Sequence, residues 1–196
     1  MKLLGLFVVL AALVASGIKP YDRATWWMEV APVLIAAPVL LATHRRFPLT
    51  PLLYALIAIH CLVLIYGGAY TYARVPLGFW LQDLVGFERN PYDRIGHFMQ
   101  GFVPAMIARE ILLRTDSVKT KKMAAFLSLC VALAFSAFYE LIEWWAALAL
   151  GQGADEFLGT QGDPWDTQAD MFLALIGATA ALAVLSGIHD RQIKRL

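Results

Sequence analysis

Charged residues are scarce in this chain of 196 residues. They make up 16% of it, whereas hydrophobic residues make up 60% and the mean hydropathy is +0.63. A soluble domain contains about 25% charged residues and about 45–50% apolar ones. The composition therefore excludes an ordinary soluble enzyme and indicates a polytopic membrane protein.

Cysteine is scarce as well, and the motifs of soluble cofactor-binding proteins are missing. Cys61 and Cys130 both lie inside apolar runs, which is typical of small buried side chains and not of a disulfide or a metal pair. The sequence has no glycine-rich phosphate loop, no zinc-finger spacing and no basic tract. We therefore expect the lipid bilayer as a partner and no nucleic acid, and no pattern favours a particular oligomeric state.

Long apolar runs are what the sequence has in place of these features. A helix needs about 20 mainly apolar residues to cross the hydrocarbon core of a bilayer. The runs predict an all-α, polytopic bundle of six transmembrane helices that forms a single domain over residues 1–196. The expected spans cover residues 3–18, 26–43, 51–70, 95–113, 123–150 and 166–188.

The first run has two interpretations. It follows Lys2 and ends near Ala15, Ser16 and Gly17, as in a cleavable signal peptide. Because five further spans follow it, we favour a retained first helix.

Lysine and arginine are concentrated in alternate loops. Basic residues follow the second, fourth and sixth expected spans, at 45–46, at 114–122 and at 191–195. Positively charged loops stay in the cytoplasm, so a plan with six spans predicts that both termini are cytoplasmic.

The connection after the third span is too long for a simple turn. Between Pro76 and Phe87, large apolar and aromatic residues surround Gln82 and Asp83. This pattern predicts a short helix in the outer membrane interface, although a soluble cap against other loops would have the same pattern.

Pairs of acidic or histidine residues lie at the outer ends of three expected spans. Asp93 and His97, at the start of the fourth span, are four residues apart and so share one helix face. A charge inside a span costs at least about 2.5–3.5 kcal/mol and usually lines a cavity or has a partner. We therefore predict a shared polar pocket. Its candidate residues are Asp93, Arg94, His97, Glu140, Glu143, Asp166 and Asp170.

Several of these residues also have a structural explanation. If the tryptophans that follow Glu143 mark the membrane boundary, Glu140 and Glu143 lie close to water and need no partner. Asp166, in a first turn, can stabilise the positive end of its helix. Asp170 lies a full turn deeper, where capping does not explain it.

Four further polar residues belong to the expected spans. Glu29, near the outer end of the second span, and His60, near the middle of the third, are secondary candidates for the pocket. His60 is also typical of an interhelical hydrogen bond, and Arg94 can neutralise one of the acids. Arg109 and Glu110 lie at the opposite end of the fourth span, where we expect them to extend to the cytoplasmic interface.

Carboxylates with an imidazole support several kinds of chemistry. They suit a divalent metal such as Zn or Mn, or Mg if the histidine is not a direct ligand, and such a metal could polarise a phosphate or activate water. The candidate ligands are His97, Glu140, Glu143 and Asp170, and Asp93 is expected to orient His97. Without a metal, paired acids could act as general acid and base on a lipid-borne substrate. A proton relay would need polar groups at several depths, and few are present.

Four segments of the chain resemble the YjdF-like family of bacterial inner-membrane proteins. They are GGAYTYARVPLGFWLQD, RNPYDRIGHFMQGFVPAMIAREILLR, SAFYELIEWW and GDPWDTQADMFLALIGA. The resemblance covers well over half of the chain and implies a multi-pass protein of the bacterial inner membrane, but no particular chemistry. A histidine is common in that family where this chain has Ala69.

A weaker similarity, to VanZ-like membrane proteins, involves the same three polar pairs. Those proteins have an Asp or Lys followed by a His at one helix start, a Glu-x-x-Gln near the end of a later helix and an Asp-x-x-x-Asn before the last. This chain has Glu143 in place of the glutamine and Asp170 in place of the asparagine. The similarity implies a role that faces the envelope or the lipid.

The leading hypothesis is an inner-membrane protein with a polar pocket at the periplasmic leaflet. The pocket would bind a polar ligand, such as a lipid or isoprenoid headgroup, directly or through a divalent metal. Two alternatives are a non-enzymatic structural or partner-subunit membrane protein and a small-molecule transporter. The sequence assigns no catalytic residue.

Overall fold

The part of the chain that the structure describes is entirely helical. A computed structural model describes residues 2–150 and 163–196, which form seven α-helices and one short 3-10 helix without a strand. This confirms the predicted all-α class. The elements are α1 (Lys2–Ile18), α2 (Arg23–Thr43), α3 (Pro51–Tyr70), η1 (Tyr72–Arg74), α4 (Pro76–Val85), α5 (Tyr92–Arg114), α6 (Lys121–Leu150) and α8 (Asp166–Ile193).

Short local signals determine where several helices begin and end. Asp22 precedes α2 and accepts a hydrogen bond of 2.7 Å from the Thr25 N–H, which lowers the pKa of the Asp22 carboxyl. Thr50 caps α3 in the same way, and Pro51 occupies the first helical position, where its missing N–H is not needed. α4 ends at Gly86, whose φ of 79° lies in the left-handed region that favours glycine.

The short helix expected after the third apolar run is present as α4. It covers Pro76–Val85, and its large apolar side chains, including Phe79, Trp80 and Leu84, are exposed. An exposed apolar face of this kind suits a helix that contacts lipid at the membrane interface.

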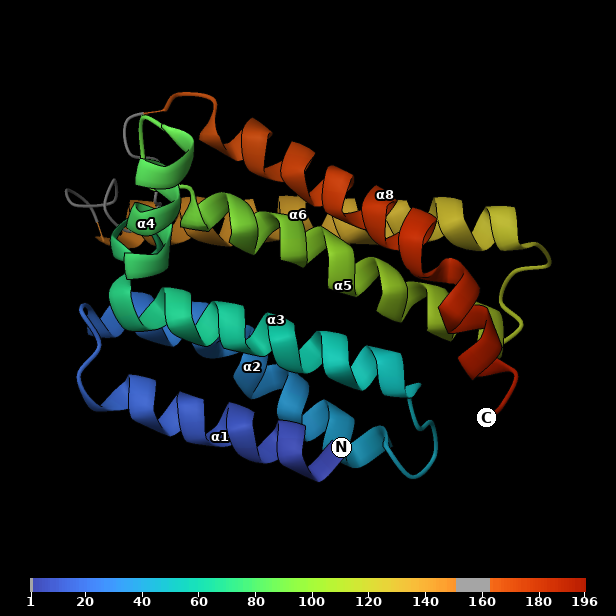
Figure 1. The fold of residues 1–196 in the computed structure, drawn as a ribbon. Helices are drawn as coiled ribbons and strands as arrows, with labels where there is room; N and C mark the ends of the chain where they lie inside the picture. Colours follow the sequence, from blue (N-terminus) through green and yellow to red (C-terminus); the bar gives the residue numbers. More distant parts are fainter. Residues whose placement is uncertain (1, 151–162) are drawn as a thin grey trace.

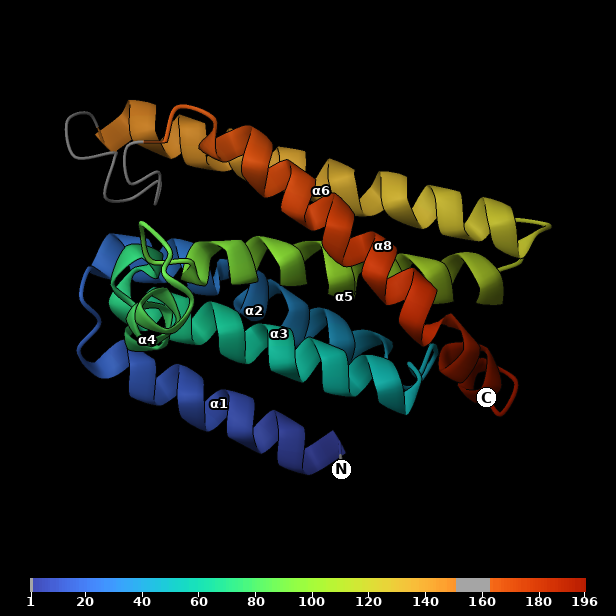
Figure 2. The same cartoon turned by 45° about the horizontal axis from the view of Figure 1, so that its top comes forward.

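Two groups of helices make up the bundle. α3 packs against α1 and α2, whereas α5 packs against α6 and α8, and a contact between α3 and α5 joins the groups. Figure 2 shows α1 and α6 on opposite sides of α5, whereas α8 crosses α5. The first group has a core that includes Trp26 of α2, Val9 of α1 and Ile65 of α3.

α5 and α8 approach each other closely because glycines lie at their contact. A Cβ atom added to Gly101 would lie 1.7 Å from the carbonyl oxygen of Ala174. One added to Gly177 would lie 2.0 Å from the carbonyl oxygen of Phe98. The two backbones therefore touch directly, as in membrane helix pairs that meet at small residues. This contact brings Asp170, one turn before Ala174, next to the first turns of α5.

Within residues 2–150 and 163–196, four helices are long and apolar enough to cross a membrane, namely α2, α3, α6 and α8. The apolar part of α1, Leu4–Ile18, is shorter than these. α5 has 23 residues but includes charged residues in its first and last turns. Length and composition therefore support membrane spans in four helices, and the plan with six spans stays a prediction.

The two ends of the bundle differ in their residues. The α2–α3 and α5–α6 connections and the C-terminus lie together at one end, which we call the basic end (Figure 1). The start of α1 is also directed toward this end. The opposite end, which we call the α4 end, contains α4 and the first turns of α5 and α8.

Candidate metal centre

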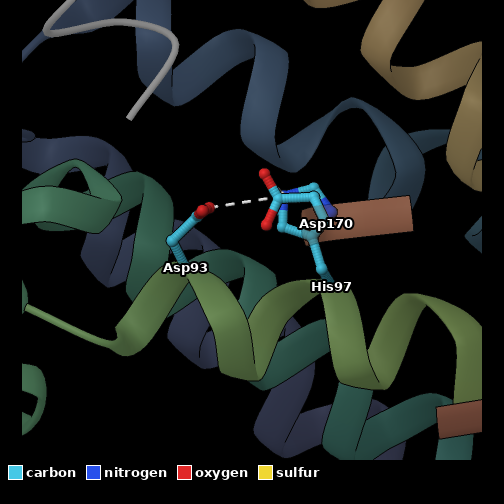
Figure 3. Close-up of side chains that lie close together, drawn as sticks. All are labelled: Asp93, His97 and Asp170. Atoms are coloured by element: carbon cyan, nitrogen blue, oxygen red, sulfur yellow. Dashed lines mark ion pairs between the residues drawn. The ribbon is translucent and has the colours of Figure 1, made fainter. Parts of the chain in front are cut away.

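His97 of α5 is surrounded by carboxylates from three helices at the α4 end. Its Nε2 atom lies 3.4 Å from Asp93 Oδ1 and 3.7 Å from Asp170 Oδ2. Its Nδ1 atom lies 3.7 Å from Glu140 Oε1 of α6. The four residues are between 3% and 9% exposed, so the group is buried. Figure 3 shows the side chains of Asp93, His97 and Asp170 converging between α5 and α8.

Three of these residues have the geometry of metal ligands. One atom each from Asp93, His97 and Asp170 can be chosen so that all three lie within 4.8 Å of one another. A tetrahedral ion with bonds of about 2.0–2.2 Å holds its ligand atoms roughly 3.3–3.6 Å apart. The separations of 3.4 and 3.7 Å at Nε2 are close to this range. Small side-chain rotations would therefore complete a site with three protein ligands and at least one open position.

The hydrogen bond of His97 to Gln100 determines which ring nitrogen can bind a cation. Nδ1 lies 2.9 Å from Gln100 Oε1, and because an amide oxygen only accepts, Nδ1 carries the proton. In a neutral ring, Nε2 then directs a lone pair toward Asp93 and Asp170, which is repulsive. A cation at Nε2, or a second ring proton, removes the repulsion. Histidine ligands of metals usually donate their other N–H to an acceptor in this way.

Glu140 lies beside the other edge of the same ring. Its Oε1 atom faces Nδ1 and is buried, and it has no hydrogen-bond partner among the described residues. A buried carboxylate oxygen without a partner is costly. Glu140 is thus positioned to orient His97 and to accept a hydrogen bond from a ligand.

Other predicted pocket residues have different surroundings. Asp166 accepts a hydrogen bond of 2.6 Å from Arg89, which also contacts Asp163 at 3.2 Å. Partial burial disfavours the charged form of Arg89, but the hydrogen bond and charge of Asp166 outweigh it and raise the pKa of Arg89. Asp166 therefore links the loop before α5 to the start of α8. Glu143 is half-buried and makes no hydrogen bond with the described residues.

The secondary candidates divide between the centre and the rest of the bundle. Glu29 is buried and accepts a hydrogen bond of 3.2 Å from the Tyr139 hydroxyl. The centroid of the Tyr139 ring lies 6.5 Å from that of the His97 ring. His60 does not belong to the group, and its Nε2 atom has no hydrogen-bond partner among the described residues, contrary to the expected interhelical bond. Arg94 lies over the ring of Phe87 and forms no ion pair with a described acid.

Three residues near His97 were missed by the sequence analysis. Gln100 lies three residues after His97, so the helical period places it on nearly the same face. Tyr139 is adjacent to Glu140 in the sequence, and Arg89 belongs to a connecting loop. Only Gln100 could have been found from the sequence, through its spacing from His97. The contacts of Arg89 and the direction of the Tyr139 side chain depend on how α2, α6 and α8 pack.

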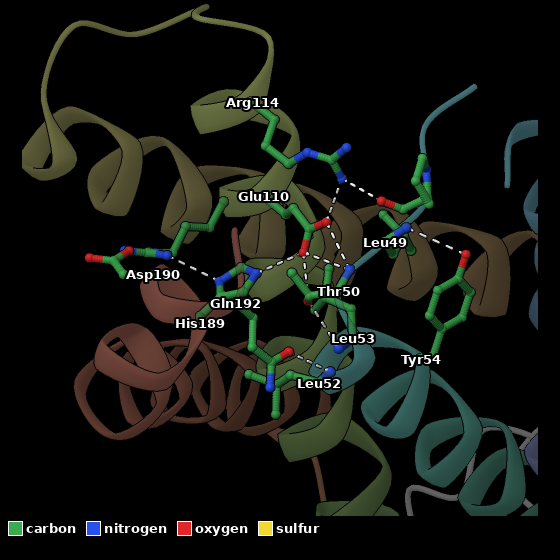
Figure 4. Close-up of polar contacts among 12 residues, drawn as sticks. Leu49, Thr50, Leu52, Leu53, Tyr54, Glu110, Arg114, His189, Asp190 and Gln192 are labelled. Atoms are coloured by element: carbon green, nitrogen blue, oxygen red, sulfur yellow. Dashed lines mark hydrogen bonds and ion pairs between the residues drawn. The ribbon is translucent and has the colours of Figure 1, made fainter. Parts of the chain in front are cut away.

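The expectation that Arg109 and Glu110 extend to the membrane interface is wrong. They are 3% and 0% exposed and lie in a polar network at the basic end. Figure 4 shows Glu110 of this network beside Thr50, Arg114 and His189. Glu110 accepts hydrogen bonds from the N–H and hydroxyl of Thr50, from His189 Nε2 at 2.8 Å and from Arg114 at 2.8 Å. Both residues stay inside because α3 and α8 supply partners there.

His189 connects the two charged residues of this network. Arg109 donates to His189 Nδ1 at 3.0 Å, so the proton of a neutral ring lies on Nε2, which donates to Glu110. Arg109 also donates to Asp190 at 2.6 Å. The network therefore joins α3, α5 and α8, with its carboxylates and its buried arginine paired.

Taken together, the apolar helices, their exposed apolar side chains and the buried acid–histidine group define a helical membrane protein with a polar site inside the bundle. The chain belongs to the family described as predicted membrane protein DUF2238, whose model matches residues 1–191. It is 61% identical over 183 residues to inner membrane protein YjdF of Escherichia coli strain K12, across 93% of this chain and 88% of that protein. This confirms the resemblance to the YjdF-like family. No solved structure matches the chain.

Proposed function

We propose that this inner-membrane protein binds a divalent cation at its α4 end and, through that cation, a polar ligand such as a lipid or isoprenoid headgroup. Asp93, His97 and Asp170 would be the protein ligands. The observation that carries the proposal is the convergence of these three buried side chains from α5 and α8 within 4.8 Å.

The proposed topology has six spans, with both termini in the cytoplasm and the α4 end at the periplasmic leaflet. Four apolar helices support the spans, and the direction of the basic loops supports the orientation. α1 and α5 would be the two remaining spans. Charged groups of α5 have partners inside the bundle, which makes a polar helix tolerable there: His97 lies beside Asp170 of α8, and Glu110 accepts hydrogen bonds from Thr50, which caps α3, and from His189 of α8.

An open coordination position is what would let the centre act on a ligand. A cation held by three protein ligands keeps at least one position for water or an oxygen of a headgroup. It could polarise a phosphate there. The buried Oε1 atom of Glu140, which has no partner among the described residues, supports a second contact to such a ligand.

A transporter is less well supported. Between His97 and Arg109, the buried positions of α5 are small or apolar, including Gly101, Val103 and Met106. They provide no row of polar side chains along this helix between the two polar groups.

Metal analysis of the purified protein tests the proposal. We expect about one Zn or Mn ion per chain after dialysis, measured by mass spectrometry of the metal and by titration calorimetry. His97→Ala and Asp170→Asn remove ligands and should weaken binding by more than about 100-fold, because even residues behind the ligands contribute about 10–100-fold. Glu140→Gln should weaken it by that smaller factor.

The control is Asp83→Asn, which removes an exposed acid of α4 at the same end of the bundle. It should leave binding unchanged. Absence of binding in the folded wild-type protein would refute the metal centre. If His97→Ala and Asp170→Asn unfold in mild detergent and the wild type binds no ion, the acids have a structural role instead.

A further inference from the structure

An apolar groove runs between α1 and α3 and reaches Tyr92 at the start of α5. Its volume is about 680 Å³, which is in the usual range for a small-molecule site. Ala12 and Ala15 of α1 and Leu62 and Val63 of α3 form much of its wall. Small side chains on α1 leave the space that larger ones would fill.

The groove has the length of one membrane leaflet. Its lining on α3 extends from Ile59 to Tyr70, which is about 16 Å at 1.5 Å per residue. Half of a hydrocarbon core of about 30 Å is a similar length. The groove therefore matches a single extended chain that begins at the α4 end.

Two of the polar residues in the lining, Ser16 and Tyr92, already donate to the Leu13 and Val63 carbonyls, whereas three other donors lie toward the α4 end of the groove. Lys19 follows α1, Tyr70 ends α3, and Tyr66 lies one turn deeper. The Lys19 ammonium and the two phenol groups make no hydrogen bond or ion pair with the described residues. The lining contains no acid. An apolar groove with donors and a positive charge at one end is complementary to an anionic headgroup.

We propose that this groove binds an acyl chain of an anionic phospholipid, with the lipid phosphate at Lys19. The inference depends on the protein lying in a membrane and not on the metal centre. Tyr92 lines the groove and directly precedes Asp93. The headgroup of the bound lipid thus lies at the same end of the bundle as His97.

A second copy of the chain fits the groove less well. Two copies related by an axis along the membrane normal would bring both Lys19 side chains to the same level. That arrangement would add a like charge and leave the phenol groups without acceptors. A phosphate supplies both the negative charge and the acceptor oxygens.

Native mass spectrometry of the delipidated protein tests this proposal. We expect phosphatidylglycerol to bind more tightly than phosphatidylcholine with the same chains. Lys19→Ala should reduce the preference about fivefold, the effect of one cation near an anionic lipid surface. Lys19→Arg should retain it. Lys122→Ala, at the basic end, is the matched control and should change nothing.

A second pair of variants tests the groove itself. Ala15→Phe fills it and should abolish retention of either lipid, whereas Ala11→Phe, on an exposed position of the same helix outside the lining, should not. Equal binding of both lipids by the wild type, or unchanged binding in Ala15→Phe, would refute the proposal. A dimer that Ala15→Phe converts to a monomer would assign the groove to a subunit contact instead. Metal binding should be the same in all of these variants, so the two proposals can fail separately.

Discussion

Glu110 and Glu140 are two glutamates buried in the same bundle, and their surroundings differ. Glu110 accepts hydrogen bonds from the backbone N–H and the hydroxyl of Thr50, from Arg114 and from His189. Glu140 retains a buried oxygen without a partner among the described residues. A satisfied buried carboxylate stabilises a fold, whereas an unsatisfied one is typical of a functional site. These two glutamates therefore indicate a structural role for the basic end and a candidate functional role for the α4 end.

Glu110→Gln should destabilise the protein strongly, because a neutral amide would face Arg114, His189 and Thr50 with one acceptor fewer. We expect a loss of about 3 kcal/mol, as for breaking one partner of a buried ion pair. Thermal unfolding in detergent, followed by circular dichroism, measures it. Glu88→Gln, at an exposed loop position, should leave the unfolding temperature unchanged. An equal effect of both variants would contradict a structural role of this network.

Sequence spacing predicted which residues of one helix lie close together, but it predicted contacts between residues of different helices much less well. The period of the helix correctly paired Asp93 with His97, and the common level of the spans brought Asp170 and Glu140 into consideration. It could not show that Asp93 lies beside Nε2 and Glu140 beside Nδ1, because that depends on the rotation of α6 and α8 around α5. The same missing information made the expectation for Glu110 wrong.

At the scale of the elements, glycine determines the distance between α5 and α8. The apolar runs predicted α2, α3, α6 and α8 well, but α5 begins at Tyr92, three residues earlier than expected, and α8 continues to Ile193. Both extensions consist of polar turns, which a hydropathy pattern does not count as a span. The close contact at Gly101 was not predicted, because a glycine in an apolar run has the same pattern whether or not a helix touches it.

Gly101→Ala should separate α5 from α8, because the new methyl group would overlap the Ala174 carbonyl oxygen. We expect a loss of about 1–3 kcal/mol, the usual effect of overpacking. Cation binding should weaken as well, although every proposed ligand is intact, because Asp170 would move away from His97. Thermal unfolding and titration calorimetry measure the two effects.

The control for this prediction is Gly187→Ala in α8, the helix that packs against α5. An added Cβ there meets no atom within 4 Å, so stability should stay the same or rise slightly. Unchanged stability and cation binding in Gly101→Ala would show that the helices adjust without separating.

At the scale of the whole molecule, the bundle has one basic end and one acidic end. The network of Arg109, Glu110 and His189 closes the basic end, and the carboxylates around His97 lie at the α4 end. Composition and the distribution of lysine and arginine predicted a membrane protein with this polarity. They did not predict that the apolar part of α1 would be shorter than the four long apolar helices, or that α5 would include polar turns at both ends.

Cysteine accessibility should report the orientation of the bundle. In a variant with Cys61→Ala and Cys130→Ala, Asp83→Cys on α4 should react with a membrane-impermeant maleimide in intact spheroplasts. Lys119→Cys, in the α5–α6 connection, should react only after the membrane is permeabilised. Labelling of both positions from the outside would mean that α5 does not span the membrane.

The polar contacts of α5 also have a consequence for the order in which the protein is built. Arg109 and Glu110 of α5 are paired with His189 and Asp190, which the ribosome adds only after the whole of α6. A helix with unpaired charges inserts poorly into lipid. In the proposed topology, α5 therefore reaches its final depth in the membrane only after α8 has been synthesised. Completion of the fold then depends on α8.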